Sequence, residues 1–323
     1  MELQTFTEKV VKALEEFYGP DARIEAQQIY KNNGVKLQGV CVLMAQKNIA
    51  PTVYINHFFE QYKEGREFGD ILSEIITLYE ENQVSRKLDI DFFLDYGKVK
   101  KKLVLRLIHK GKNKELLKEI PYEEFNDLAV VCHCLIVNES IGKGSVLIHR
   151  HHLQAWKISE KELFRAAKEN SPRLQPYCLQ PMSRMIKEIM ERSIEDSVEE
   201  ICREYPQDKE AFLESTLSQM TDEIDRCRLP MYVLTNKDRY YGASCILYEG
   251  ILEELAERLR GDFYILPSSV HELILVEKQG EDKKEEYNQM VREVNACHVD
   301  IQEWLANHAY LYVSKENRVI SLE

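Results

Sequence analysis

Residues 23–44 have the sequence RIEAQQIYKNNGVKLQGVCVLM, which gives the first indication of the fold class. Two strand-like segments, Arg23–Tyr30 and Val35–Met44, flank the residues Asn32-Asn33-Gly34. Asparagine and glycine tolerate the positive φ angles of a tight turn, so Asn33-Gly34 is typical of a β-hairpin. The stretch therefore predicts two neighbouring strands joined by a short turn.

The chain on either side continues this mixture of strands and helices. Residues 2–18 carry one apolar stripe at spacings of three and four, and Gly19-Pro20 ends it, which predicts a helix. A short strand is expected at 52–55, followed by helices at about 56–64 and 68–82. Because no long βαβ series follows, we expect an α+β fold with mixed or antiparallel sheets and packed helices.

The remaining elements divide the chain into three predicted portions. Strands are expected at 103–108, 128–137 and, more weakly, 145–148, with a turn-rich loop at 138–144. Residues 178–226 are expected to be helical and acidic, without a strand. The last third predicts strands at 231–235, 263–266 and 272–276, helices at 251–259 and 287–294, and a final hairpin at 310–322. These patterns favour an N-terminal α+β portion at 1–148, a mainly helical connection at 149–226 and a C-terminal α+β portion at 227–323.

Composition and charge narrow the class of protein. The 323 residues carry 43 Lys and Arg against 55 Asp and Glu, a net charge of −12. This balance disfavours a chain-wide grip on nucleic acid or on an anionic membrane. The first residues lack the pattern of a secretory signal, and no apolar run is long enough to span a bilayer. We expect a cytoplasmic protein whose eight scattered cysteines are buried free thiols.

The most suggestive chemistry lies in residues 267–272, Pro-Ser-Ser-Val-His-Glu, between two expected strands. Serine needs a neighbouring base to become a nucleophile, and histidine needs an orienting acid. Ser268, Ser269, His271 and Glu272 supply these residue types within five positions. Members of a catalytic triad usually come from distant segments, however, and no Gly-x-Ser-x-Gly elbow is present. A turn in which the hydroxyls cap backbone groups is therefore favoured over a hydrolase site.

A second candidate segment, residues 236–239, follows another expected strand end. If this loop meets the 267–272 loop, Lys237 and Arg239 would bind an anion with Ser269 and His271 as hydrogen-bond donors. The alternative is a solvated turn of mixed charge. The candidate ligand-binding residues are Asn236, Lys237, Arg239, Ser268, Ser269, His271 and Glu272.

Metal and cofactor motifs are not evident. Cys132-His133-Cys134 and His149-Arg150-His151-His152 contain zinc-binding residue types, but no Cys-x-x-Cys pair occurs. On a strand Cys132 and Cys134 share one face, so we expect them to pack in a core. The chain also lacks a dinucleotide-binding or P-loop glycine motif. We predict no metal site and no cofactor.

Residues 98–118 form a basic island of nine Lys or Arg residues around the single acid Glu115. Such an island is capable of binding RNA or DNA, but only Leu and Ile interleave with the basic residues, without stacking aromatics. A solvated face, or one paired with the acidic segment at 188–214, is favoured.

Three stretches of the sequence are considered together: Asn33–Val40 with Ala50–Ile55, Leu229–Lys237 with Tyr241–Ala243, and Tyr264–Glu272. In this order they resemble an uncharacterised family of Firmicute proteins, domain of unknown function 5688. Residues Leu153–Ser159 and Pro267–Ser269 carry a fainter likeness to the YtpQ-like proteins. The resemblance implies a cytoplasmic bacterial protein and supplies no reaction, cofactor or catalytic residue.

The sequence favours a non-enzymatic interaction or ligand-binding protein over an enzyme. Its partner is expected to be another protein or a small anionic ligand, not a membrane. A small-molecule hydrolase using Ser268–Glu272 is the first alternative, and nucleic-acid binding through residues 98–118 is the second.

Overall fold

The structure is a computed structural model that describes residues 2–45, 47, 50–83, 91–138, 142–188, 231–280 and 282–323. Contacts between Cα atoms divide the chain into two units. The first contains residues 1–103, 112–121 and 133–163, and the second contains residues 104–111, 122–132 and 164–323. The three-portion division at residues 148 and 226 stays a prediction. The α+β class is confirmed, because helices accompany sheets whose paired strands run antiparallel.

The first unit begins with α1 (Leu3–Tyr18), which ends at Gly19 with a positive φ of 66°, as its sequence predicts. The strands β1 and β2 pair antiparallel as the predicted hairpin, with Tyr30 opposite Lys36. Its other elements include β6 in part, β7 and the start of α7. The bounds are β1 (Ala22–Tyr30), β2 (Lys36–Met44), β3 (Thr52–Tyr54), α2 (Asn56–Lys63), α3 (Phe68–Glu81), α4 (Tyr96–Val99), α5 (Leu116–Glu119), β6 (Leu128–Asn138), β7 (Gly142–Leu147), α6 (Arg150–Trp156) and α7 (Glu160–Leu174).

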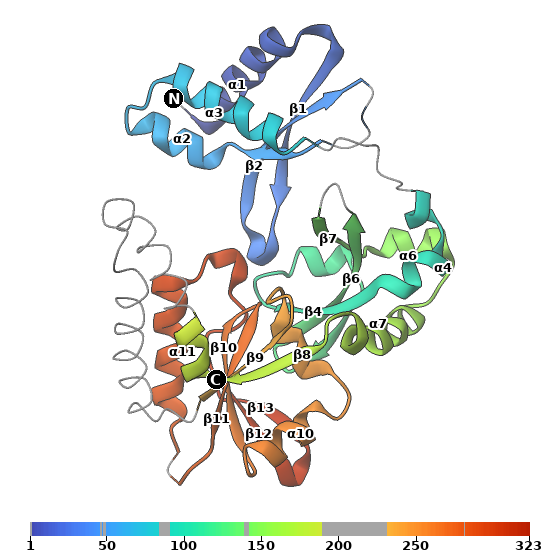
Figure 1. Cartoon of the computed structure of the whole chain (residues 1–323), viewed down its shortest axis with the longest axis vertical. Coiled ribbons are helices and arrows are strands. Elements are labelled where there is room, and N and C mark those ends of the chain that lie inside the picture. The colour runs from blue at the N-terminus through green and yellow to red at the C-terminus, as the bar shows by residue number, and fades with distance from the viewer. Residues whose placement is uncertain are drawn as a thin grey trace, which may run out of the picture. The chain divides into compact units, whose positions relative to one another are not determined.

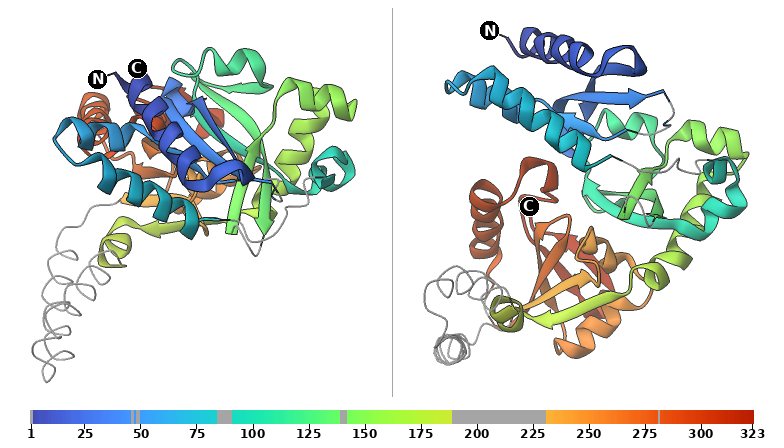
Figure 2. Two further views of the ribbon diagram at one scale, coloured as in Figure 1. Left: turned by 90° about the horizontal axis from the view of Figure 1, so that it is seen from above. Right: turned by 45° about the horizontal axis from the view of Figure 1, so that its top comes forward.

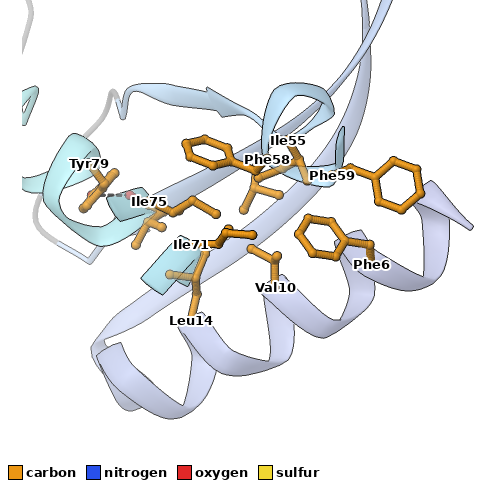
Figure 3. Packing of buried hydrophobic residues seen from close by; sticks show 11 residues of the cluster. Phe6, Val10, Leu14, Ile55, Phe58, Phe59, Ile71, Ile75 and Tyr79 are labelled. Carbon is orange, nitrogen blue, oxygen red and sulfur yellow. Dashed lines mark hydrogen bonds between the residues drawn. The ribbon is translucent and has the colours of Figure 1, made fainter. Parts of the chain in front are cut away.

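The core of this first unit lies between the three N-terminal helices and the β1–β2–β3 sheet. Phe6, Val10 and Leu14 of α1 point toward residues of α2 and α3 (Figure 3). Each of these three side chains is at most 1 % exposed, and burial of such a side chain contributes roughly 1.5–3 kcal/mol. The hydroxyl of Tyr79 donates to the Val42 carbonyl, which ties α3 to β2.

Three asparagines hold the predicted hairpin turn. Asn33 and Gly34 adopt positive φ angles of 60° and 71°. The backbone N–H of Asn33 donates to Oδ1 of Asn113 at 2.9 Å. The Asn113 amide donates in turn to Oδ1 of Asn32 at 2.9 Å and of Asn33 at 3.0 Å. The turn itself could therefore be predicted from residues 32–34, whereas the hydrogen bonds that hold it come from Asn113, far along the chain.

The second unit is built on a six-stranded antiparallel sheet of order β13-β12-β10-β11-β9-β8. Helix α11 lies along one face of this sheet (Figures 1 and 2) and packs Tyr287 and Val291 against Tyr264 and Val276. The unit also holds most of β4, β5 and the first half of β6. The bounds are β4 (Leu103–His109), β5 (Tyr122–Phe125), β8 (Tyr177–Pro181), β9 (Met231–Asn236), α10 (Ile251–Arg258), β10 (Phe263–Ser269), β11 (Glu272–Glu277), α11 (Lys284–His298), β12 (Tyr310–Val313) and β13 (Arg318–Ser321).

Two predicted segments differ from the structure. Residues 177–181 form β8 instead of a helix, because they pair with β9 at the edge of the sheet, where Pro181 can sit. The loop expected at 138–144 is shorter, since Asn138 pairs with Gly142 across β6 and β7. In addition, strand β5 has no counterpart in the sequence prediction. Most of the acidic helical prediction, residues 189–226, lies outside the described residues.

Within the described ranges, no helix has the length and apolar character that crossing a membrane requires.

Candidate functional site

The two candidate loops of the second unit meet beside β9 and β11. These strands are antiparallel neighbours, with Leu273 opposite Leu234, so the end of β9 lies beside the start of β11. Thr235 Oγ1 donates to the His271 carbonyl at 2.8 Å. The Tyr241 N–H donates to His271 Nδ1 at 3.0 Å. The structure thus brings His271 together with the chain that follows Asn236.

Asn236 shapes the turn that leads into this site. Its amide Nδ2 donates to the Tyr240 carbonyl at 2.8 Å, and its Oδ1 accepts from the Tyr240 N–H at 3.2 Å. The turn holds Arg239 and Tyr241 at positive φ angles of 51° and 54°. Left-handed backbone is unfavourable for such side chains and persists only where surrounding contacts require it. Asn236, which is 1 % exposed, supplies those contacts.

Both ring nitrogens of His271 have partners, and neither partner is a serine. Because Nδ1 accepts the Tyr241 N–H, the proton of the neutral ring lies on Nε2. Nε2 is 3.4 Å from Oε1 of Glu303, which orients the ring. A triad histidine needs one nitrogen free to accept a nucleophile's proton. In this structure neither nitrogen of His271 serves that purpose.

The two candidate serines bond locally. Ser269 Oγ accepts the His271 N–H at 3.0 Å, which closes the turn between β10 and β11. Ser268 Oγ donates to Oε1 of Glu272 at 3.3 Å. Both contacts match the expected turn in which hydroxyls and carboxylates satisfy nearby groups.

The two candidate cations of the turn point to other partners or to solvent. Arg239 pairs with Oε2 of Glu188 at 2.5 Å, and Lys237 is exposed. Neither residue has a described contact with Ser269 or His271. The loops meet as the sequence hypothesis requires, but the positive charge that contacts Tyr240 and Tyr241 comes from another segment.

That charge is Arg106, in the middle of β4. Sequence analysis assigned it to the basic island, yet the side chain is 0 % exposed. Its Nη1 donates to the Tyr240 carbonyl at 3.0 Å. The guanidinium carbon lies 4.5 Å from the ring centroid of Tyr241 and 5.4 Å from that of Tyr240. Arg106 therefore lies under the turn that Asn236 shapes.

Two serine hydroxyls position β4 for this contact. The N–H of Leu105 donates to Ser171 Oγ at 2.9 Å, and that of Leu107 donates to Ser244 Oγ at 2.9 Å. β4 stands at the end of its own sheet, of order β4-β6-β5, so these hydroxyls satisfy its otherwise unpaired edge. Ser244 follows Tyr241 closely, which brings the turn next to Arg106.

Among the described residues, Arg106 has partners for only part of its guanidinium. Nε and Nη2 are buried, and no described residue offers either of them a hydrogen-bond acceptor. No carboxylate of the described residues forms an ion pair with it, and its electrostatic neighbours are Tyr240, Tyr241, Tyr248 and Cys245. Burial lowers the pKa of Arg106 to about 10, against a smaller opposing effect of Tyr241, so the group stays charged at neutral pH. A buried charge without a partner lowers the stability of the fold by several kcal/mol, about as much as the removal of one member of a buried ion pair.

The other basic residues of the island with described contacts follow the expected surface pattern. Lys110 pairs with Glu124 at 2.6 Å, and Lys118 pairs with Glu115 at 2.7 Å. Arg106 is the one arginine among eight lysines, within the apolar run LVLRLIH. An arginine inside an apolar run indicates a buried strand position, and a count of charges alone does not show this.

The candidate metal-binding residues pack as side chains of the core or of an aromatic cluster. Cys132 and Cys134 are 0 % exposed on β6, as expected, although Cys297 is exposed in contrast to the prediction of buried thiols. His152 stacks on Trp156 with ring centroids 5.5 Å apart. Across the ranges that the structure covers, no three His, Cys, Asp or Glu side chains gather as a metal site.

An apolar cavity of about 430 Å³ lies between α11 and the sheet. Leu266, Ile274 and Val294 line it, and Ser268 and His298 also reach it. No hydrogen bond joins Ser268 to His298 among the described contacts. The cavity therefore shows no activated nucleophile.

Residues 3–314 match the Family of unknown function (DUF5688). The chain belongs to this family. No curated protein and no solved structure matches it. The Firmicute origin and the YtpQ likeness stay predictions. DUF5688 membership supplies no catalytic residue.

Proposed function

We propose that the protein is a non-enzymatic, cytoplasmic ligand-binding protein that holds a small anion on Arg106. The observation that carries the proposal is the fully buried guanidinium with two unpaired nitrogens and no described carboxylate partner. Arginine cannot neutralise itself at physiological pH, so an acceptor of opposite charge offsets its cost of burial. The Asn236–Tyr241 turn and His271 form the rim of the proposed site.

The alternatives receive less support. For a hydrolase, the hydroxyl of Ser268 would need an imidazole as its base, but it donates to Glu272 while the His271 ring bonds to Tyr241 and Glu303. For nucleic-acid binding, the island would need free cations, but Arg106 is buried and Lys110 is paired.

Thermal unfolding of the full chain with added anions tests the proposal. Sodium phosphate, sulfate and acetate at ~50 mM are compared with sodium chloride of equal ionic strength, since a ligand that binds the native state raises Tm. We expect at least one anion to raise Tm of the wild type and not of the Arg106→Met variant. Lys110→Met is the matched control, because it removes one exposed positive charge beside the same strand.

The unliganded Arg106→Met variant separates ligand binding from a structural role. Methionine replaces a buried charge with an apolar chain, a change that is neutral or stabilising by roughly 1–4 kcal/mol. We expect stability equal to or above that of the wild type. A variant that is less stable, together with anion responses equal to those of the wild type, would show that Arg106 only clamps Tyr240.

A further inference from the structure

The unpaired nitrogens of Arg106 form a single recognition edge. Nη1 donates to the Tyr240 carbonyl, whereas Nε and Nη2 have no acceptor in the part of the chain that the structure describes. The N–H bonds of Nε and Nη2 run parallel on one side of the planar guanidinium. Arginine grips a carboxylate or a phosphate through two such parallel bonds. The ligand is therefore expected to present two oxygens of one group to this edge.

The described electrostatic neighbours of Arg106 include no second positive charge. Tyr241, Tyr248 and Cys245 are the neutral neighbours, because burial raises the pKa of both tyrosines and raises that of Cys245 to about 12. Lys237 is exposed and Arg239 is paired with Glu188. One cation fully compensates one negative charge. A dianion would leave a net buried charge, which is costly.

A carboxylate at the rim disfavours a dianion further. Glu303 lies 3.4 Å from His271 and acts electrostatically on Tyr241, whose ring stacks on Arg106. Its negative charge repels excess charge on a ligand beside Tyr241. The ring of Tyr241 and the buried Cys245 are the apolar groups beside the guanidinium, and they match a ligand with an apolar body.

We infer that Arg106 binds the carboxylate of a small monocarboxylic acid with an apolar body, through paired hydrogen bonds from Nε and Nη2. This inference rests on the proposed anion binding and narrows it to one class of ligand. Planar carboxylate oxygens match both donors, and the single negative charge matches the single guanidinium.

Titration calorimetry on the full chain, with pairs of acids and their neutral amides, tests this class. The probes are acetate, propionate and benzoate, the corresponding amides acetamide, propionamide and benzamide, and inorganic phosphate. We expect at least one carboxylate to bind and its amide to bind at least about tenfold more weakly. Phosphate, titrated at about pH 8.5 where it is mainly a dianion, should give no saturable heat, because the edge carries a single positive charge.

Two variants link the result to the guanidinium edge. Arg106→Lys keeps the charge but loses the parallel donors, so we expect at least about a tenfold loss of carboxylate affinity. Lys110→Met should bind as the wild type does. If Arg106→Met fails to fold, Arg106→Lys replaces it as the variant that tests whether binding depends on the guanidinium.

The outcomes separate the two proposals. Arg106-dependent binding of phosphate in preference to every carboxylate would overturn the monocarboxylate class and leave anion binding standing. Equal binding of an acid and its amide would also overturn the class. No Arg106-dependent binding of any probe up to ~100 mM, weaker than any physiological small-molecule site, would overturn both.

Discussion

At the scale of single residues, burial lowers the pKa of Arg106 and of His152, with different consequences. The pKa of Arg106 falls to about 10, so the group remains charged at pH 7 and needs a partner. The pKa of His152 falls from 6.5 to about 4, through burial first and then through His151 and His149. The neutral ring accepts the His149 N–H on Nδ1 at 3.0 Å. His152 therefore needs no counter-ion at pH 7.

His152 should make stability depend on pH. Between pH 6.5 and about 4 the unfolded chain binds a proton that the folded chain excludes, so the free energy of unfolding falls as the pH falls through this window. The contribution of His152 to the free energy of unfolding is fully present above pH 6.5. Because the side chain is partly exposed, we expect a slope below about 1 kcal/mol per pH unit. Urea unfolding of His152→Gln across pH 4–7 should show a shallower slope than the wild type.

The control for this change is His57→Gln. His57 is an exposed histidine of the same unit, and it bonds to Gln61 on the surface of α2. Its variant should keep the wild-type slope. If the free energy of unfolding had the same pH slope in His152→Gln and in the wild type, the partly buried imidazole of His152 would not be the cause of the pH dependence.

At the scale of elements, Gly242 allows the turn after β9 to pack against the start of β11. A Cβ atom there would lie 2.2 Å from Thr235 Oγ1, 2.5 Å from the Asn236 nitrogen and 2.6 Å from the His271 carbonyl oxygen. Two of these atoms belong to the backbone, one at the end of β9 and one in the residue before β11, so neither can move away easily. Gly242 is thus required by close approach, not by a positive φ.

Gly242→Ala should destabilise the second unit and disturb the proposed site together. Overpacking of this kind costs about 1–3 kcal/mol, which urea unfolding measures. The control is Gly69→Ala in α3, where nothing lies within 4 Å of the added carbon. Alanine in an exposed helix is expected to be stabilising by roughly 0.5–1 kcal/mol. Equal stability of Gly242→Ala and wild type would show that β9 and β11 separate without cost.

At the scale of the whole molecule, charge is distributed unevenly along an acidic chain. The net charge is −12, and the basic island carries a single buried arginine among its lysines. Several of those lysines form contacts within the protein: Lys110 with Glu124, Lys118 with Glu115, and Lys102 over the Phe92 ring. The surface of the island is less available to phosphates than its count of nine basic residues suggests.

We therefore expect no saturable binding of generic single-stranded RNA or duplex DNA. Fluorescence anisotropy at ~50 mM salt should show a dissociation constant weaker than about 100 μM, below ordinary non-specific binding. A tighter complex that weakens steeply as salt is raised would contradict this expectation, because that salt dependence reports phosphate contacts.

Local patterns were sufficient to predict most elements of this protein. Helical periodicity predicted α1, α3 and α11, and turn residues predicted the β1–β2 and β12–β13 hairpins. These features depend on side chains within a few positions of one another. Strands β5 and β8 escaped prediction because their identity depends on partners far along the chain, β6 and β9.

The sequence by itself determined the α+β class, the turn chemistry of Asn33-Gly34 and the local bonding of Ser268 and Ser269. Only the tertiary structure decided that Arg106, separated by more than a hundred positions from Tyr240, lies buried beneath the Asn236–Tyr241 turn. The physical reason is that burial of a charge depends on which distant strands cover it. A count of basic residues carries no information about that covering.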